Sequence, residues 1–319
     1  MPACAHPDAS AVRLFAARDY ITGEAFDVSR CGACGLARTA PWPDPSRMDA
    51  YYPPAYYGER GARRFPTIVE ALQRLLYGTR ARTVERLAGR PGRVLDVGCG
   101  RGFLLDAFRR RGWDVRGTEL DDRAAAHARE VLGIPVETGP ASSWTWPDGH
   151  FDALTIWHVL EHLQEPAEML ARAHRLLRPG GVLMVGVPDF GSPEARLTRA
   201  AWFHLDVPRH TTHLSARWLG GALDEAGFEV RRRSASTPEY DAFSLVQSTE
   251  NRLGLRQNLL YELLRGRGAK LLGEGGSGRA QAPLAVLLAI PLALVALPVT
   301  TALGVSGRGS SVTFWARRR

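Results

Sequence analysis

A glycine-rich turn in the first third of the chain has the composition of a ligand-binding loop. It follows a short apolar run that contains Asp96, and it carries Gly98, Gly100 and Gly102 at alternate positions. Glycines allow a tight turn and a close approach of the backbone to a ligand, which the free N–H groups of the following helix can bind. A dinucleotide loop would need its third glycine one residue later, where the chain has Phe103. The spacing therefore argues against a nicotinamide or flavin cofactor.

An acidic residue, Glu119, ends the next predicted strand about twenty residues after this loop. A carboxylate at this position can accept hydrogen bonds from both hydroxyls of a ribose. The loop and the acid together are a stronger signal than either alone. They predict a site for a ligand that contains a ribose.

Side chains suited to acid–base chemistry gather in two later loops, one around His158 and His162 and one that ends in His213. A helical turn would place His158 and His162 on one face. One histidine, His158 or His213, could act as a general base on a substrate hydroxyl. Alternatively, a divalent metal could hold the substrate oxygen through four side chains, those of His158, Glu161, His162 and His213. A third interpretation gives these residues only a positioning role.

The N-terminal region contains half of a recognisable zinc site. Cys31 and Cys34 have the Cys-x-x-Cys spacing and are followed by Gly35, so one turn can bring both thiolates to one ion. Cys4 and His6 are the soft ligands available for the other half. We therefore predict a structural zinc on these four side chains, with a degenerate module that lacks the metal as the alternative.

The segments around these motifs alternate between strands and helices. Predicted strands cover residues 93–97, 115–119, 151–157, 182–187 and 228–232, and predicted helices cover residues 65–87, 104–110, 122–131, 166–177 and 214–226. Alternation of this kind specifies a parallel sheet with helices on both faces. The sequence therefore predicts a doubly wound α/β fold.

Length and composition allow one full-sized core with smaller additions, since the chain has 319 residues of which 45% are apolar. Its net charge of +8 could indicate a nucleic-acid partner. However, Lys270 is the only lysine among the 41 basic residues, so a coding bias explains the arginine content better. The first ten residues contain no apolar run and cysteines are few, so we expect a cytoplasmic protein.

Several motifs are shared with a known family. They are Cys31-Gly-Ala-Cys34-Gly35-Leu36, the pairs Tyr51-Tyr52 and Tyr56-Tyr57, residues 96–102, Glu119, Phe151-Asp152, Leu160-Glu161-His162, Leu177-Arg-Pro-Gly-Gly181 and Pro188-Asp189. In these features, residues 31–230 resemble class I S-adenosylmethionine-dependent methyltransferases. More narrowly, they resemble a bacterial group with an N-terminal zinc-binding module.

The resemblance implies a mostly parallel seven-stranded sheet of the Rossmann-like kind. It places the aminocarboxypropyl group of S-adenosylmethionine beside Asp96 and the three loop glycines, and the ribose beside Glu119. Trp157, at the end of the predicted strand 151–157, is expected to face the transferred methyl group and to bind the cofactor. Some relatives bind metal through Glu-x-x-Glu-His at this place, where this chain has His158 instead of the first glutamate.

The function implied by the resemblance is O-methylation of a small-molecule, glycan or lipid-linked acceptor. A non-catalytic protein that binds S-adenosylmethionine or acts as a scaffold is the alternative, and an RNA-directed enzyme is less favoured. The expected organisation is a zinc-binding arm at residues 1–62, a methyltransferase core at 63–235 and a C-terminal extension at 236–319.

The C-terminal extension suggests contact with a membrane. Residues 280–307 carry no charge and are long and apolar enough for a spanning helix, but Pro291 lies in the middle. A single span would also leave Arg308 and later arginines outside the cytosol. We therefore expect a shallow hairpin that turns near Pro291 on the cytosolic face of the membrane. A buried helical pair packed on the core is the alternative.

Overall fold

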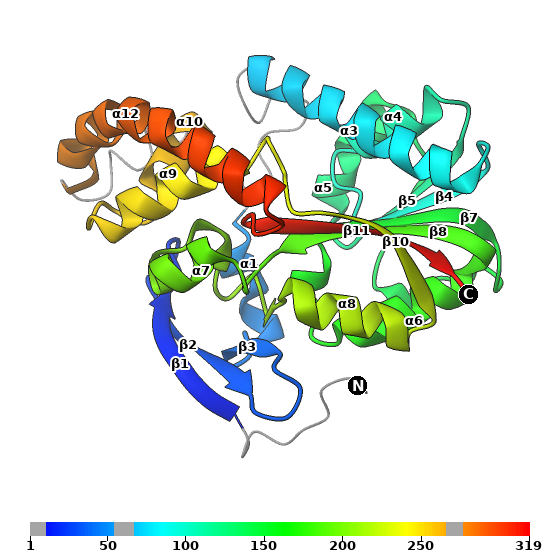
Figure 1. Ribbon diagram of the computed structural model, residues 1–319, viewed down its shortest axis with the longest axis horizontal. Helices are drawn as coiled ribbons and strands as arrows, with labels where there is room; N and C mark the ends of the chain where they lie inside the picture. The colour runs from blue at the N-terminus through cyan, green and yellow to red at the C-terminus, as the bar shows by residue number, and fades with distance from the viewer. Residues whose placement is uncertain (1–10, 54–66, 266–276) are drawn as a thin grey trace.

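A seven-stranded sheet forms the centre of the protein in the computed structural model, which describes residues 11–53, 67–265 and 277–319 (Figure 1). The strand order is β10-β11-β8-β7-β4-β5-β6. The strands are β4 (Arg93–Val97), β5 (Asp114–Glu119), β6 (Val136–Thr138), β7 (Phe151–Trp157), β8 (Leu177–Pro188), β10 (Phe228–Ser234) and β11 (Ser311–Arg318).

Helices cover both faces of this sheet, which confirms the predicted doubly wound fold (Figure 1). One face packs on α3 (Thr67–Ala88) and α4 (Phe103–Arg109), and the other packs on α6 (Pro166–Leu176) and α8 (Ala216–Glu225). In β4, Val94 belongs to the first core and Leu95 to the second, and both are completely buried. Strands buried on both faces are apolar at successive positions rather than at alternate ones.

Strand β11 lies inside the sheet, although the sequence analysis assigned its residues to the C-terminal extension. It pairs antiparallel with both β10 and β8. The pairs β4–β5, β4–β7, β5–β6 and β7–β8 are parallel, so the sheet is mixed. The catalytic fold is therefore completed by residues that follow the whole apolar segment.

The N-terminal region forms a second, antiparallel sheet instead of an irregular knuckle. Its order is β1 (Ala11–Arg18), β2 (Ala25–Cys31), β3 (Ala37–Ala40) and β9 (Thr212–His213). Phe26, Val28 and Tyr51 pack there against Trp202, so an apolar core holds this module. Within the described residues nothing supports a zinc-binding module, and the predicted ligands Cys4 and His6 lie outside them.

The C-terminal segment contains α9 (Asp241–Arg252), α10 (Leu259–Leu264) and α12 (Ser277–Val305). The expected hairpin at Pro291 is wrong, because α12 continues through Pro283, Pro291 and Pro298. Each proline removes one backbone hydrogen bond, while the surrounding leucines and alanines are strong helix formers. Among the described residues, α12 is the one helix long and apolar enough to cross a membrane.

Short helical elements complete the described chain. They are η2 (Pro45–Arg47), α1 (Met48–Tyr51), α5 (Asp122–Ala126), η3 (His127–Val131), η4 (Ala141–Ser143), η5 (Leu160–His162), α7 (Pro193–Thr198), η6 (Arg199–Ala201) and η7 (Phe203–Leu205).

Candidate active site

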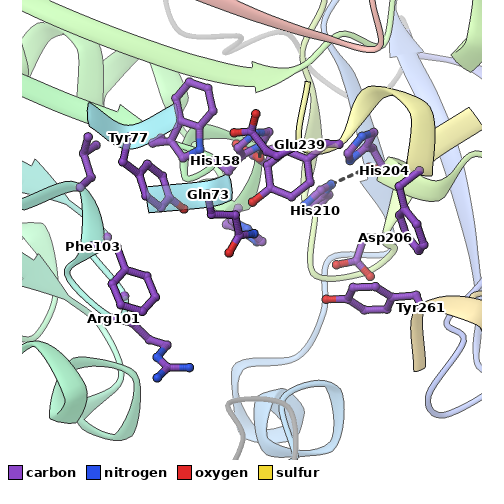
Figure 2. A pocket seen from close by; sticks show the side chains of 18 of the residues that line it. Gln73, Tyr77, Arg101, Phe103, His158, His204, Asp206, His210, Glu239 and Tyr261 are labelled. Atoms are coloured by element: carbon purple, nitrogen blue, oxygen red, sulfur yellow. Dashed lines mark hydrogen bonds and ion pairs between the residues drawn. The ribbon is translucent and has the colours of Figure 1, made fainter. Parts of the chain in front are cut away.

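A cavity of about 460 Å³ opens where β4 and β7 end. Parallel sheets bind ligands at these carboxyl ends, and the volume suits a small organic ligand. Figure 2 shows Arg101 and Phe103 on one side of the cavity and Asp206 and Tyr261 on the other. The lining also includes Gln73, Tyr77, Asp96, Gly98, Gly100, Gly102, Trp157, His158, Glu161, His162, Phe203, His204, His210, Glu239, Tyr240, Phe243 and Leu264.

The glycine loop needs glycine for two different reasons. Gly98, Gly100 and Gly102 have φ angles of 67°, 49° and 77°, which side chains with a Cβ rarely adopt. A Cβ added to Gly98 would lie 2.5 Å from Cγ2 of Val159, and one added to Gly102 would lie 2.7 Å from Cβ of Ala128. A Cβ on Gly100 would meet nothing within 4 Å. The loop is therefore tightly packed on both sides and open at its centre.

Asp96 places a buried carboxyl group at the base of this loop. Burial raises its pKa to about 7, with Glu119 adding to the increase and the hydroxyl of Thr155 opposing it. Thr155 donates a hydrogen bond of 2.5 Å to Oδ1 of Asp96. Among the described residues, no cationic side chain contributes to this pKa. A ligand with a positive charge would therefore stabilise the ionised carboxylate.

Glu119 supports the loop from the end of β5. The N–H of Gly100 donates to Oε2 at 2.9 Å, and the N–H of Leu120 donates to Oε1 at 2.8 Å. A carboxylate has about four acceptor positions, so each oxygen can still accept a ligand hydroxyl. Glu119 is thus fixed at the loop, and its contact with a ribose stays a prediction.

Trp157 forms part of the cavity wall at the end of β7. The guanidinium of Arg80 lies 4.0 Å from the centre of its ring, and Arg80 forms a buried ion pair with Glu239. The ring also packs against Gly186, where an added Cβ would lie 2.4 Å from a ring carbon. The indole is therefore fixed by both Arg80 and Gly186.

His158 and Glu161 form a polar pair at the cavity. Nδ1 of His158 lies 3.0 Å from Oε1 of Glu161, and Nε2 has no partner among the described protein atoms. Burial alone would raise the pKa of Glu161, but the contact with His158 and the nearby charges of His210 and His162 together outweigh it, and the pKa falls to about 2. An ionised carboxylate only accepts, so Nδ1 donates to Glu161, and in the neutral ring Nε2 then keeps its lone pair. This is the arrangement of a general base with an orienting carboxylate.

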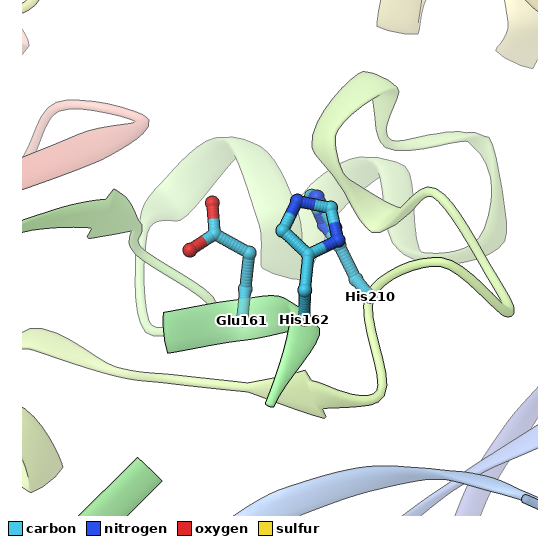
Figure 3. Close-up of side chains that lie close together, drawn as sticks. All are labelled: Glu161, His162 and His210. Carbon is cyan, nitrogen blue, oxygen red and sulfur yellow. The ribbon is translucent and has the colours of Figure 1, made fainter. Parts of the chain in front are cut away.

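A second group of ligand atoms shares Glu161. Glu161, His162 and His210 offer metal-ligand atoms within 4.8 Å of one another, and Figure 3 shows that His210 comes from a neighbouring loop. Nδ1 of His162 lies 2.9 Å from the carbonyl oxygen of Arg209, and Nδ1 of His210 lies 2.8 Å from that of His204. Carbonyl oxygens only accept, so each Nδ1 carries the proton, and in the neutral rings both Nε2 atoms have lone pairs. These residues could hold a divalent cation.

The structure does not bring His213 to this cavity. Its side chain is buried in β9, Nε2 lies 3.0 Å from Oγ1 of Thr39, and the residue borders a second cavity. His204 and His210, from the same histidine-rich loop, line the first cavity instead. The expected helical turn is also different, because η5 begins only at Leu160 and excludes His158.

Aromatic side chains from η7, α9 and α10 form another part of the cavity wall. The rings of Phe203, Phe243 and Tyr261 pack edge to face, with 5.3 Å between the centres of Phe203 and each of the other two. The sequence analysis missed Phe243 and Tyr261 because it treated α9 and α10 as an extension. Tyr51 is buried in the N-terminal core, and Tyr56 and Tyr57 lie outside the described residues.

Comparison with known proteins decides the family. A family model described as a methyltransferase domain matches residues 68–232, just over half of the chain. The chain is a class I S-adenosylmethionine-dependent methyltransferase.

Curated relatives of this methyltransferase come from bacteria. A probable S-adenosylmethionine-dependent methyltransferase of Mycolicibacterium smegmatis is 33% identical over 47% of this chain and 56% of its own length. A ubiquinone biosynthesis O-methyltransferase of Pseudomonas aeruginosa is 32% identical over 48% of this chain and 71% of its own length. A solved structure of a putative sarcosine dimethylglycine methyltransferase from Galdieria sulphuraria aligns with a TM-score of 0.49 and 15% identity, over 80% of this chain and 91% of its own. The match to the mycobacterial relative therefore spans little more than half of that protein.

The cavity of this methyltransferase fits the cofactor that the family uses. S-adenosylmethionine carries an ammonium group and a ribose, and when bound it supplies an electrophilic methyl group. Asp96 provides a buried carboxyl group without a cationic neighbour among the described residues, and the open centre of the loop at Gly100 leaves room for a ligand. Asp96, the three loop glycines and Trp157 all line the cavity.

Proposed function

We propose that this methyltransferase methylates an oxygen atom of a small-molecule, glycan or lipid-linked acceptor, with His158 as the general base. The pair formed by His158 and Glu161 is the observation that carries this proposal. Nε2 of His158 has no described protein partner and belongs to a side chain that lines the cavity. The similarity to an O-methyltransferase of ubiquinone biosynthesis supports an oxygen acceptor.

The proposed chemistry assigns one proton transfer to this chain. The acceptor hydroxyl donates a hydrogen bond to Nε2 of His158, and its proton moves to Nε2 as the oxygen becomes nucleophilic. The neighbouring Glu161 carboxylate stabilises the imidazolium that results. Phe203, Phe243 and Tyr261 orient the acceptor and exclude water from the reacting oxygen.

A second version of the same function uses a divalent cation. The available ligand atoms are a carboxylate oxygen of Glu161 and one imidazole nitrogen each of His162 and His210. Imidazole nitrogens suit transition metals such as zinc, whereas carboxylate oxygens suit magnesium or manganese. A cation there would lower the pKa of an acceptor hydroxyl without a histidine base. This set replaces the predicted one, because His213 borders another cavity.

The test is transfer of labelled methyl groups from S-adenosylmethionine into extracts of bacterial lipids and small molecules. We expect transfer by the native protein, loss of transfer in His158→Ala, and equal cofactor affinity for both by calorimetry. Transfer that persists in His158→Ala, but stops with a chelator and returns with added cation, would assign the metal version. Cofactor binding without transfer to any fraction would favour the non-catalytic alternative.

A structural zinc in the N-terminal module stays a separate proposal. Cys31 and Cys34 lie on the turn between β2 and β3, where the N–H of Gly35 donates to the carbonyl of Cys31 at 3.0 Å. Gly35 has a φ of 75°, which suits the tight turn needed to direct two thiolates to one ion. The remaining proposed ligands are Cys4 and His6.

A further inference from the structure

Helix α12 presents an apolar face to solvent. Leu287, Ile290 and Leu294 are 70%, 68% and 70% exposed, and their spacing places them on one side of the helix. Leu284, Val286, Val295 and Leu297 extend the same exposed surface, with exposures from 45% to 61%. Only 11% of the most apolar stretch of α12 is buried, so the alternative of a buried helical pair is wrong. Large exposed apolar surfaces of this kind mark sites of interaction.

The opposite side of α12 fixes the helix to the catalytic domain. Ala296 is buried in a small core with Val246 of α9 and Leu260 of α10. Near the start of the helix, Oε1 of Gln281 accepts a hydrogen bond of 2.7 Å from the N–H of Arg256. The helix therefore has one anchored face and one exposed apolar face.

Its connections prevent α12 from crossing a bilayer. The helix ends at Val305, and Ser311 already begins β11, which pairs with β8 inside the catalytic sheet (Figure 1). The other end is bonded to Arg256, close to α9 and α10. A spanning helix needs its ends on opposite sides of about 30 Å of hydrocarbon. Both ends of α12 are attached to the same domain, so the helix can only lie on the membrane surface.

The charges around α12 are those of a surface that meets anionic lipid. The described helix surface from Ala280 to Val305 is uncharged, and residues 277–319 contain no Asp or Glu. Arg308 directly after the helix and Arg252 at the end of α9 are both exposed. Basic residues beside an apolar helix face favour an anionic bilayer over a neutral one.

Helices α12 and α10 both lie between this surface and the active-site cavity. Tyr261 and Leu264 of α10 line the cavity, while Leu260 of the same helix packs toward α12. Leu264 is 44% exposed, so it lies where the cavity meets solvent. Each helix is about 10 Å across, so a lipid-linked acceptor must extend about 20 Å from the membrane surface to reach the cavity.

We infer that α12 docks the protein on an anionic membrane surface and that the methyl acceptor is a lipid-linked molecule presented from that membrane. The docking surface is the exposed face formed by Leu287, Ile290 and Leu294. The identity of the acceptor as a lipid-linked molecule rests on the proposed function, whereas the docking does not.

The docking test is flotation of the full chain with vesicles of phosphatidylcholine alone or mixed with phosphatidylglycerol. We expect the native chain to bind the mixed vesicles. The affinity for these vesicles should fall by about tenfold or more in the triple variant Leu287→Asp, Ile290→Asp, Leu294→Asp. Leu197→Asp is the matched control, because Leu197 is 75% exposed on α7. A chain shortened before α12 is unsuitable, since it would also lose β11. Circular dichroism should show that all variants keep their fold.

Three outcomes would overturn the docking. The first is that the native chain fails to float with the mixed vesicles. The second is that it resists extraction by alkaline carbonate, as a spanning protein does. The third is that it self-associates in ultracentrifugation and that the triple variant does not. For the acceptor, labelled methyl groups should appear in the lipid fraction. Label found only in water-soluble products would overturn the lipid-linked acceptor, whereas absence of label from every fraction would count against the proposed function itself.

Discussion

Nδ1 of His158 lies 3.0 Å from Oε1 of Glu161, and the ring is held there by an unusual backbone conformation. His158 has a φ of 54°, which is costly for a residue with a Cβ, and its N–H donates to the carbonyl of Gly186 at 2.9 Å. The hydrogen bond to β8 thus stabilises a strained residue that lines the same cavity as the glycine loop. Strain of this kind is concentrated at functional sites.

The first prediction concerns this pair. His158→Ala should lower the rate of methyl transfer by about 10²- to 10⁴-fold, because the acceptor loses its base, while the cofactor affinity stays unchanged. Glu161→Gln should have a smaller effect, since an amide oxygen can still accept from Nδ1 but carries no charge. Single-turnover rates with labelled cofactor measure both effects.

His213→Ala is the control for that prediction. Its ring contacts Thr39 and borders the second cavity, so its loss should lower thermal stability rather than the rate per folded molecule. An equal loss of rate in His158→Ala and His213→Ala would contradict the assignment of the base.

The second prediction links cofactor binding to pH through Asp96. Burial raises the pKa of this carboxyl group to about 7, so below this pH the ligand-free protein holds it protonated. A bound ammonium group favours the ionised form, and binding at about pH 6 should therefore release a proton. Affinity should rise with pH up to about 7 and then level off.

Calorimetry in two buffers with different ionisation enthalpies measures this proton release. Asp96→Asn is the control, since an amide cannot titrate in this range, and it should bind more weakly with no such pH dependence. Proton uptake by the native protein, or the same pH profile in Asp96→Asn, would show that another group titrates.

The third prediction tests the packing of the glycine loop. Gly98→Ala should abolish measurable cofactor binding, because its Cβ would lie 2.5 Å from Cγ2 of Val159. Adding Val159→Ala removes this methyl group, and the double variant should regain part of the affinity. Recovery should be incomplete, since the φ of 67° still costs about 1–2 kcal/mol for alanine. Identical titrations for the single and double variants would exclude this contact as the cause.

The fourth prediction concerns the N-terminal module. Elemental analysis should find about one zinc per chain, lost in Cys31→Ser and Cys34→Ser. Cys99→Ser is the control, because Cys99 lies in the cofactor loop, where burial raises the pKa of its thiol. Zinc absent from the native protein, or retained after both substitutions, would rule out this ligand set.

Local patterns made the cofactor loop predictable from the sequence. Strand β4 and its glycines need only neighbouring residues to define them, and the predicted residues 93–97 coincide with Arg93–Val97. The strand β11 was not predictable in the same way, because its place between β10 and β8 depends on residues 79 to 135 positions away. Pairing between strands so distant in the sequence produces no local hydrophobic pattern from which the place of β11 in the sheet could be predicted.

The histidines illustrate the same limit within the site. His204, His210 and His213 occur in one loop, and an irregular loop has no repeat that assigns its side chains to a face. The pairing of Thr212 with Arg38 and of His213 with Ala37 in the second sheet turns His213 away from the cavity. That pairing involves the N-terminal module, whose strands were not foreseen.

The position of β11 also fixes the order in which the protein can assemble during synthesis. In the described sheet, β10 is joined to β8 only through β11, so β10 has no place to pair until residues 311–318 have left the ribosome. Helix α12 precedes them and emerges with its apolar face uncovered while the sheet is still incomplete. Pairing between segments so far apart in the chain is slow, because the intervening loop must close first. A nascent chain would therefore expose an apolar helix before its catalytic domain has finished folding.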